Sequence, residues 1–354
     1  MDGKLLEEFR SLKRFIMVFG TVVLLGLLFT FASPLLHLLL MLYAGILFAV
    51  LLSGLAQLIR KKIDVSYRTG VVGVISALLI FSILGGWFMG NRVAREITVL
   101  QERLPKAEED LKELLENAPW GKSVLSLTEE TDKLWSLDSG MVGNITGFFS
   151  ETAGVLVSIG FVLVAGVYIS ISPSRYLDGF LKLFPSSRRG EVKEILDSIG
   201  TALQKWLVGR LFAMVTVGVL TTIGLAAAGV PSSLALGLLA GLLAFVPFLG
   251  PIIAVIPAFL VALIENLLLL VPVAVIFVVV HLIGGYVVTP LVQNRAVSLS
   301  PVLLLTSQVL IGLLLGIPGI IIATPLTITV IVVIQKTYIE GYLRDSVEVL
   351  GQGP

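Results

Sequence analysis

Apolar runs alternate with short charged segments along most of the chain. Phe15–Phe31 and Leu35–Ile59 are each close to the length of about 20 apolar residues that crosses a bilayer as a helix. Only Ala32, Ser33 and Pro34 separate them, so the pattern predicts a transmembrane hairpin. A third run, Thr69–Gly90, is rich in glycine and other small residues that allow close helix packing. Residues 1–90 are therefore predicted to form three spans.

This membrane pattern stops between residues 91 and 140. Apolar residues recur there at spacings of three and four, which predicts amphipathic helices, and Pro105 separates the first helix from the second. We interpret residues 91–146 as a small helical domain outside the membrane. A solvated linker is the alternative that the sequence leaves open.

Apolar runs resume at Gly147–Ile171, the fourth predicted span, and residues 147–354 form the predicted transport core. A charged segment, residues 174–205, follows, and its apolar positions predict an amphipathic helix after Pro185. Further spans are expected at Trp206–Ala228, Leu267–Val292, Pro301–Leu315 and Pro318–Gln335.

The apolar stretch from Gly229 to Pro257 is long enough for one helix but is interrupted. Pro247, Gly250 and Pro251 weaken helical backbone bonding, so we expect a helix over residues 232–246, a turn at 247–251 and a second helix from Ile252. Each half of this broken hairpin, residues 232–265, is short for a span. Open backbone at membrane depth is tolerated where protein buries it or water reaches it, and transporters bind substrates at such breaks. A simple packing turn is the competing interpretation.

Composition supports the membrane assignment. The chain is 56% hydrophobic and 14% charged, with a mean hydropathy of +1.00, values typical of an all-α polytopic membrane protein with about eight transmembrane segments. It has no cysteine and two histidines, which argues against disulfides and thiolate or histidine metal sites. A net charge of +1 gives no indication of nucleic-acid binding. No phosphate-binding glycine loop is present, so we expect no enzyme activity and no cofactor.

The distribution of Lys and Arg predicts the orientation. Of the 25 basic residues, 17 fall on the side of the N-terminus, seven lie in residues 91–140 and Arg210 lies within a span. The positive-inside rule then places both termini in the cytoplasm and residues 91–146 outside. We expect a multi-pass protein of a cytoplasmic membrane.

Polar residues within apolar segments are candidates for function, because they are costly in lipid unless they face a partner or water. Arg210 could bind an anionic or hydroxylated solute, or extend to the interface. Glu265 and His281 are the candidates for binding a proton or cation, with interfacial and packing roles as their alternatives. The remaining candidates on the solute or ion pathway are amides and a polar turn, namely Gln293, Asn294, Arg295 and Gln308, together with Pro247, Gly250 and Pro251 of the break.

Several motifs resemble the autoinducer-2 exporter family of bacterial and archaeal membrane proteins. They are QKWLVGR at 204–210, LALGLLAGLLAFVPFLGP at 234–251, YVVTPLVQNRAVSLSP at 286–301 and IGLLLGIPGIIIATPL at 311–326. They follow one another in family order between residues 204 and 326. One departure is Ser300, where the family often has histidine between leucine and proline.

The resemblance implies a secondary transporter that exports a small polar solute, of the autoinducer-2 type in some members, by alternating access around the hairpin. Other members are linked to sodium or proton antiport, so a monovalent cation/proton antiporter remains an alternative. A membrane scaffold without transport activity is the alternative of another class. The resemblance also suggests a homo-oligomer, with a pentamer as the specific expectation.

Overall fold

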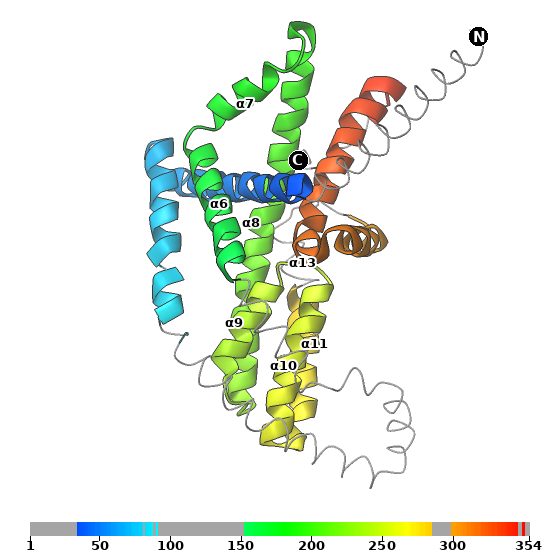
Figure 1. Ribbon diagram of the computed structural model, residues 1–354. Coiled ribbons are helices and arrows are strands. Elements are labelled where there is room, and N and C mark those ends of the chain that lie inside the picture. The colour runs from blue at the N-terminus through cyan, green and yellow to red at the C-terminus, as the bar shows by residue number, and fades with distance from the viewer. Residues whose placement is uncertain are drawn as a thin grey trace, which may run out of the picture.

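The computed structural model describes residues 34–80, 82–87, 90, 152–284, 299–345, 349 and 350, and every regular element in these ranges is a helix (Figure 1). The predicted span Phe15–Phe31 and the predicted outer domain, residues 91–146, lie outside the described residues. The all-α prediction is confirmed.

The helices follow one another with short connections. In chain order they are Pro34–Arg60, Tyr67–Trp87, α6 (Thr152–Ile171), α7 (Pro173–Leu181), a 3-10 turn (Ser186–Arg188), α8 (Arg189–Ala227), α9 (Ser233–Leu243), α10 (Leu249–Glu265), a 3-10 turn (Leu267–Leu269), α11 (Leu270–Ile283), α13 (Pro301–Ile334) and a π-helix (Gln335–Leu343).

Four helical segments of the described residues are long and apolar enough to cross a membrane: Pro34–Arg60, Tyr67–Trp87, Ser186–Ala227 and Pro301–Leu343. A fifth arises if α6 and α7, which meet at a bend of 90°, count as one span. Helices α9, α10 and α11 are apolar but shorter. These segments make the protein a polytopic membrane protein, while the total of about eight spans stays a prediction.

Helix α8 joins two segments that the sequence separated. The predicted amphipathic helix before Trp206 and the predicted span after it form one helix of 39 residues. At 1.5 Å per residue, such a helix is about 58 Å long, whereas the hydrocarbon core of a bilayer is about 30 Å thick. Its charged N-terminal part therefore extends beyond the membrane as a continuation of the span.

Helix α13 is sharply bent at Gly316. This glycine has φ 66° and ψ −153°, a conformation that L-residues with a side chain rarely adopt, and Pro318 follows it. The bend confirms the predicted division between Pro301–Leu315 and Pro318–Gln335. Around it the two arms touch, because a Cβ added at Gly312 would lie 2.7 Å from Cγ1 of Ile320.

The broken hairpin packs against two neighbouring helices. Its two helices, α9 and α10, lie beside α8 and α11, and buried residues of all four helices form one apolar cluster (Figure 1). The cluster includes Leu225 of α8, Ala240 of α9, Ala258 of α10 and Val273 of α11. The hairpin is thus held on a continuous core along the C-terminal half of α8.

Glycines bring α8 and α9 into backbone contact. A Cβ at Gly237 would overlap Oγ1 of Thr222, and a Cβ at Gly241 would lie 2.8 Å from the carbonyl oxygen of Met214. Small residues at this spacing are the usual means by which helices approach closely in a membrane. The seam ties α9 firmly to α8.

Gly241→Val is expected to lower the melting temperature of the purified protein by several degrees, because overpacking a close contact costs about 1–3 kcal/mol. Gly160→Val is the matched control, since no atom lies within 4 Å of a Cβ added at Gly160. Thermal unfolding followed by circular dichroism measures the difference. Equal melting temperatures for the two variants would show that the seam is not tightly packed.

Candidate transport site at the helix break

The helix break predicted from Pro247, Gly250 and Pro251 is present. Helix α9 ends at Leu243 and α10 begins at Leu249, so residues 244–248 leave the regular helix. The break begins and ends about three residues earlier than predicted. Helix α10 starts ahead of Pro251 because a proline in the first helical turn lacks an N–H group that would have no helical partner there.

Gly250 does not supply the positive φ angle of the break. The residue with positive φ at the break is Phe248, with φ 62° and ψ −56°, whereas Gly250 lies in the first turn of α10. Gly250 is buried, and a Cβ at this position would overlap the carbonyl oxygen of Leu243. The glycine is required because the end of α9 touches the start of α10.

Two carbonyl groups at the break are bound by side chains from other helices. Nε of Arg210 on α8 donates a hydrogen bond of 2.9 Å to the carbonyl oxygen of Phe245. Nε2 of Gln308 on α13 donates one of 2.9 Å to the carbonyl oxygen of Pro247. Carbonyls at a helix end lack partners within the helix, and Arg210 supplies one for Phe245. The carbonyl oxygen of Pro247 also accepts a hydrogen bond of 2.7 Å from the N–H of Leu249, so Gln308 is its second donor. Three segments far apart in sequence meet here.

Arg210 brings a positive charge to this site. Its side chain is partly buried, and the Trp206 ring one turn earlier packs edge-on against the ring of Phe245, with 5.7 Å between ring centres. Within the described residues, Glu194 of α8 forms an ion pair with Lys336, whereas Arg210 forms none. A guanidinium near a helix break can attract an anionic group or donate to solute hydroxyls.

Gln308 also carries an unused acceptor. Its side chain is fully buried, and its Oε1 atom has no hydrogen-bond partner in the described structure. Thr324 is also buried, with 1% of its surface exposed, and its Oγ1 atom likewise has no hydrogen-bond partner in the described structure. Gln308 lies one turn before Gly312, and Thr324 one turn after Ile320, so both lie on the facing sides of the α13 bend. A buried polar group left unpaired costs about 1–3 kcal/mol, so each of these two atoms would gain from a hydrogen bond to a polar ligand.

The sequence did not identify Thr324 as a candidate. Threonines in apolar helices usually donate to a carbonyl of the preceding turn, as Thr327 and Thr329 do. Only the structure shows that Thr324 lacks such a bond.

His281 and Glu265 occupy different parts of the hairpin. Nδ1 of His281 lies 2.7 Å from the carbonyl oxygen of Phe277, and the two rings are stacked. A carbonyl oxygen can only accept, so Nδ1 carries a proton in this contact, while Nε2 is buried and has no hydrogen-bond partner in the described structure. Glu265 is the last residue of α10 and is exposed. The polar turn of Gln293, Asn294 and Arg295 lies outside the described residues.

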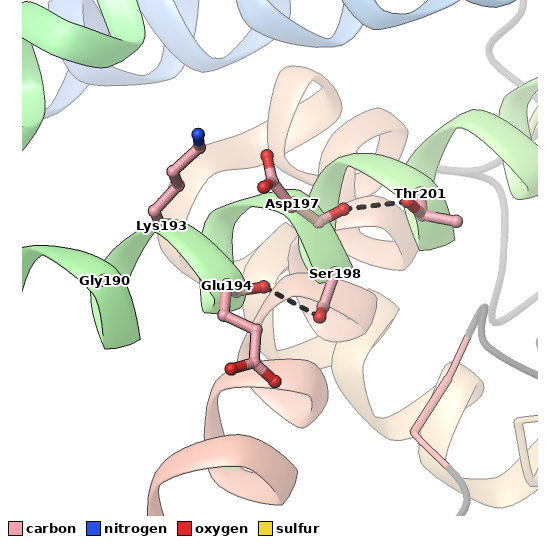
Figure 2. A pocket seen from close by; sticks show the side chains of 6 residues that line it. All are labelled: Gly190, Lys193, Glu194, Asp197, Ser198 and Thr201. Carbon is pink, nitrogen blue, oxygen red and sulfur yellow. Dashed lines mark hydrogen bonds between the residues drawn. The ribbon is translucent and has the colours of Figure 1, made fainter.

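A surface cavity of about 290 Å³ lies away from the break, on the N-terminal part of α8 (Figure 2). Its lining is Gly190, Lys193, Glu194, Asp197, Ser198 and Thr201. The hydroxyls of Ser198 and Thr201 donate to carbonyl oxygens of Glu194 and Asp197, and the Glu194 carboxylate pairs with Lys336. This cavity contains none of the predicted pathway residues.

A polytopic helical protein with a charged side chain at a helix break has the construction typical of membrane transporters. The chain belongs to the AI-2E transporter family, whose sequence pattern matches residues 15–339. It is 25% identical over 303 residues to YueF of Bacillus subtilis, covering 80% of each chain. It is 23% identical over 301 residues to the AI-2 transport protein TqsA of Escherichia coli, covering 82% of this chain and 83% of TqsA.

Proposed function

We propose that this protein exports a small polar solute of the autoinducer-2 type from the cytoplasm, by alternating access around the break between α9 and α10. Family membership supports a role in membrane transport, and the likeness to TqsA suggests the class of solute. The observation that carries the proposal is the pair of break carbonyls held by Arg210 and Gln308.

These two hydrogen bonds suggest how a solute would bind. A molecule rich in hydroxyl groups can donate to the carbonyls of Phe245 and Pro247 and accept from the guanidinium and amide groups that now occupy them. The solute would thereby replace hydrogen bonds inside the protein, so that these two carbonyls have partners in both the empty and the loaded site. An exchange of this kind keeps the cost of opening the site low.

The seam between α8 and α9 suggests which parts move together. Because the backbones of α8 and α9 touch at Gly237 and Gly241, we expect these helices to move as one unit. The bent helix α13 meets the break through Gln308, and we propose that its displacement from the Pro247 carbonyl opens the site. The same displacement would expose Oε1 of Gln308 and Oγ1 of Thr324 to the solute.

Solute flux in proteoliposomes tests the proposal. The full-length protein is reconstituted, vesicles are loaded with autoinducer-2, and its release is followed against protein-free vesicles with and without a proton gradient. Release that saturates with solute concentration and falls in Gln308→Ala is the expected result. Flux that does not exceed the leak of protein-free vesicles, or that is unchanged in Gln308→Ala, contradicts it.

The cation/proton antiport alternative has one observation in its favour, the unpartnered Nε2 of His281. A buried imidazole acceptor can take up a proton when a cation leaves. Under this alternative, added sodium should dissipate an imposed pH gradient, and His281→Gln should abolish the effect. If sodium leaves the gradient unchanged, antiport is rejected.

Orientation is tested through single cysteines, because the natural chain has none. We expect Lys122→Cys to react with an impermeant thiol reagent in intact cells and Arg189→Cys to react only after permeabilisation, since the positive-inside rule places residue 122 outside and residue 189 inside. Equal labelling of both variants in intact cells would contradict the predicted orientation.

A further inference from the structure

The connection between α6 and α8 contains a short helix at right angles to a span. Helix α6 ends at Ile171, Pro173 opens α7, and the two axes differ by 90°. If α6 crosses the membrane, α7 lies along the membrane surface. Residues 173–189, from α7 to the start of α8, are called the elbow below.

The elbow exposes a row of large apolar side chains. Tyr176, Phe180 and Leu183, spaced by four and three residues, are 45%, 46% and 77% exposed, while Leu181 on the neighbouring face is buried. Phe180 also packs against Phe184, with ring centres 5.5 Å apart. Aromatic residues exposed in this way are typical of helices that lie at the boundary between lipid and water.

Basic side chains border this apolar row. The elbow contains four, Arg175, Lys182, Arg188 and Arg189, against one acidic residue, Asp178. All four bases are exposed, and the ion pairs recorded among the described residues include none of them. Nε of Arg189 donates to the carbonyl oxygen of Phe184 at 3.0 Å, which fixes the turn into α8. On a helical projection, Arg175 and Lys182 lie next to the exposed aromatic row.

We propose that the elbow binds the headgroups of anionic phospholipids in the cytoplasmic leaflet, with Tyr176, Phe180 and Leu183 inserted among the acyl chains. The net charge of the segment complements phosphate groups, and its exposed apolar row lies on the segment that directly follows α6. A soluble protein partner would match the charge but would not explain an apolar row at the end of a span.

The elbow is also connected to the transport site. It opens directly into α8, a single helix that carries Arg210 twenty-one residues after Arg189. Anionic lipid bound at the elbow would fix the position of α8 and so influence the hydrogen bond between Arg210 and Phe245. This consequence rests on the proposed function, whereas lipid binding itself does not.

Lipid binding is therefore measured separately from flux. The purified full-length protein in neutral detergent is titrated with phosphatidylglycerol or phosphatidylcholine, and its thermal stability is recorded. We expect phosphatidylglycerol to stabilise the protein more than phosphatidylcholine. Each basic residue near an anionic surface is worth about 1 kcal/mol. The midpoint, meaning the concentration of phosphatidylglycerol that gives half of the maximal stabilisation, should therefore rise at least about tenfold in the triple variant Arg175→Gln, Lys182→Gln, Arg188→Gln.

Two comparisons make the test specific. The triple variant Lys61→Gln, Lys62→Gln, Arg68→Gln removes the same charge from another predicted cytoplasmic segment. It should shift the midpoint less, because these charges do not lie beside the exposed apolar row of the elbow. Phe180→Ser should weaken the effect of the lipid without changing the charge. Equal midpoints for the two triple variants overturn the proposal, as does full stabilisation by glycerol phosphate alone, which would identify a site for free anions. If lipid binds as expected but flux is absent, only the proposed function fails.

Discussion

Arg210→Met should lower solute flux per inserted molecule by about tenfold to a hundredfold while the protein still folds. The substitution removes the donor to the Phe245 carbonyl and the charge beside the break. A hydrogen bond lost from a buried group costs about 1–3 kcal/mol, and about 1.4 kcal/mol corresponds to a factor of ten. Methionine keeps the length and the apolar stem of arginine, so the packing of α8 should survive.

Two variants of the same helix control this prediction. Lys205→Met removes a charge five residues earlier and should leave flux unchanged, since Lys205 makes no recorded contact with the break. Arg210→Lys retains the charge but not the planar guanidinium, and should restore little activity if the geometry of the bond to Phe245 matters. Arg210→Met with natural flux would mean that Arg210 merely extends to the interface.

Gly250→Leu is expected to abolish most flux, and the structure gives the reason. A side chain at this position collides with the carbonyl of Leu243, which is backbone and cannot rotate away. The start of α10 must then move away from the end of α9, and the carbonyls of Phe245 and Pro247 move with the break. Flux is measured in proteoliposomes and divided by the amount of folded, inserted protein.

Gly312→Leu provides the comparison. A Cβ at Gly312 meets only the side chain of Ile320, which can adjust, so this variant should lose activity only in step with folding. Gly250→Leu should lose activity beyond any loss of folding. If both variants lose flux and folding in the same proportion, the break is a structural turn and not the centre of transport.

The sequence predicted the interruption at the centre of the fold because prolines leave an unambiguous mark on an apolar run. It misplaced the limits by about three residues, since nothing in the sequence indicates that Phe248, and not a glycine, takes the positive φ angle at the break. The continuity of α8 was missed for a different reason. A change from charged to apolar composition at Trp206 marks the membrane surface and not the end of a helix.

The sequence predicted two side chains of the candidate site but not their hydrogen-bond partners. Arg210 and Gln308 were identified because polar side chains are rare in apolar segments, but their partners are backbone carbonyls, which every residue possesses. No sequence pattern could show that both side chains reach the same break from α8 and α13. Nor could it show that Thr324 lacks the hydrogen bond within its own helix that Thr327 makes.

The most direct measurement of the central claim asks whether water reaches the break. Val246→Cys places a thiol between the two bound carbonyls, and Val275→Cys places one on the exposed apolar face of α11, where Val275 is 54% exposed and lipid would cover it. Both are treated, in the reconstituted protein, with a small charged thiol reagent that reacts only in water. We predict that Val246→Cys reacts, that autoinducer-2 protects it, and that Val275→Cys does not react. An unreactive Val246→Cys in protein that transports solute would contradict the account, because the solute would then cross by another route.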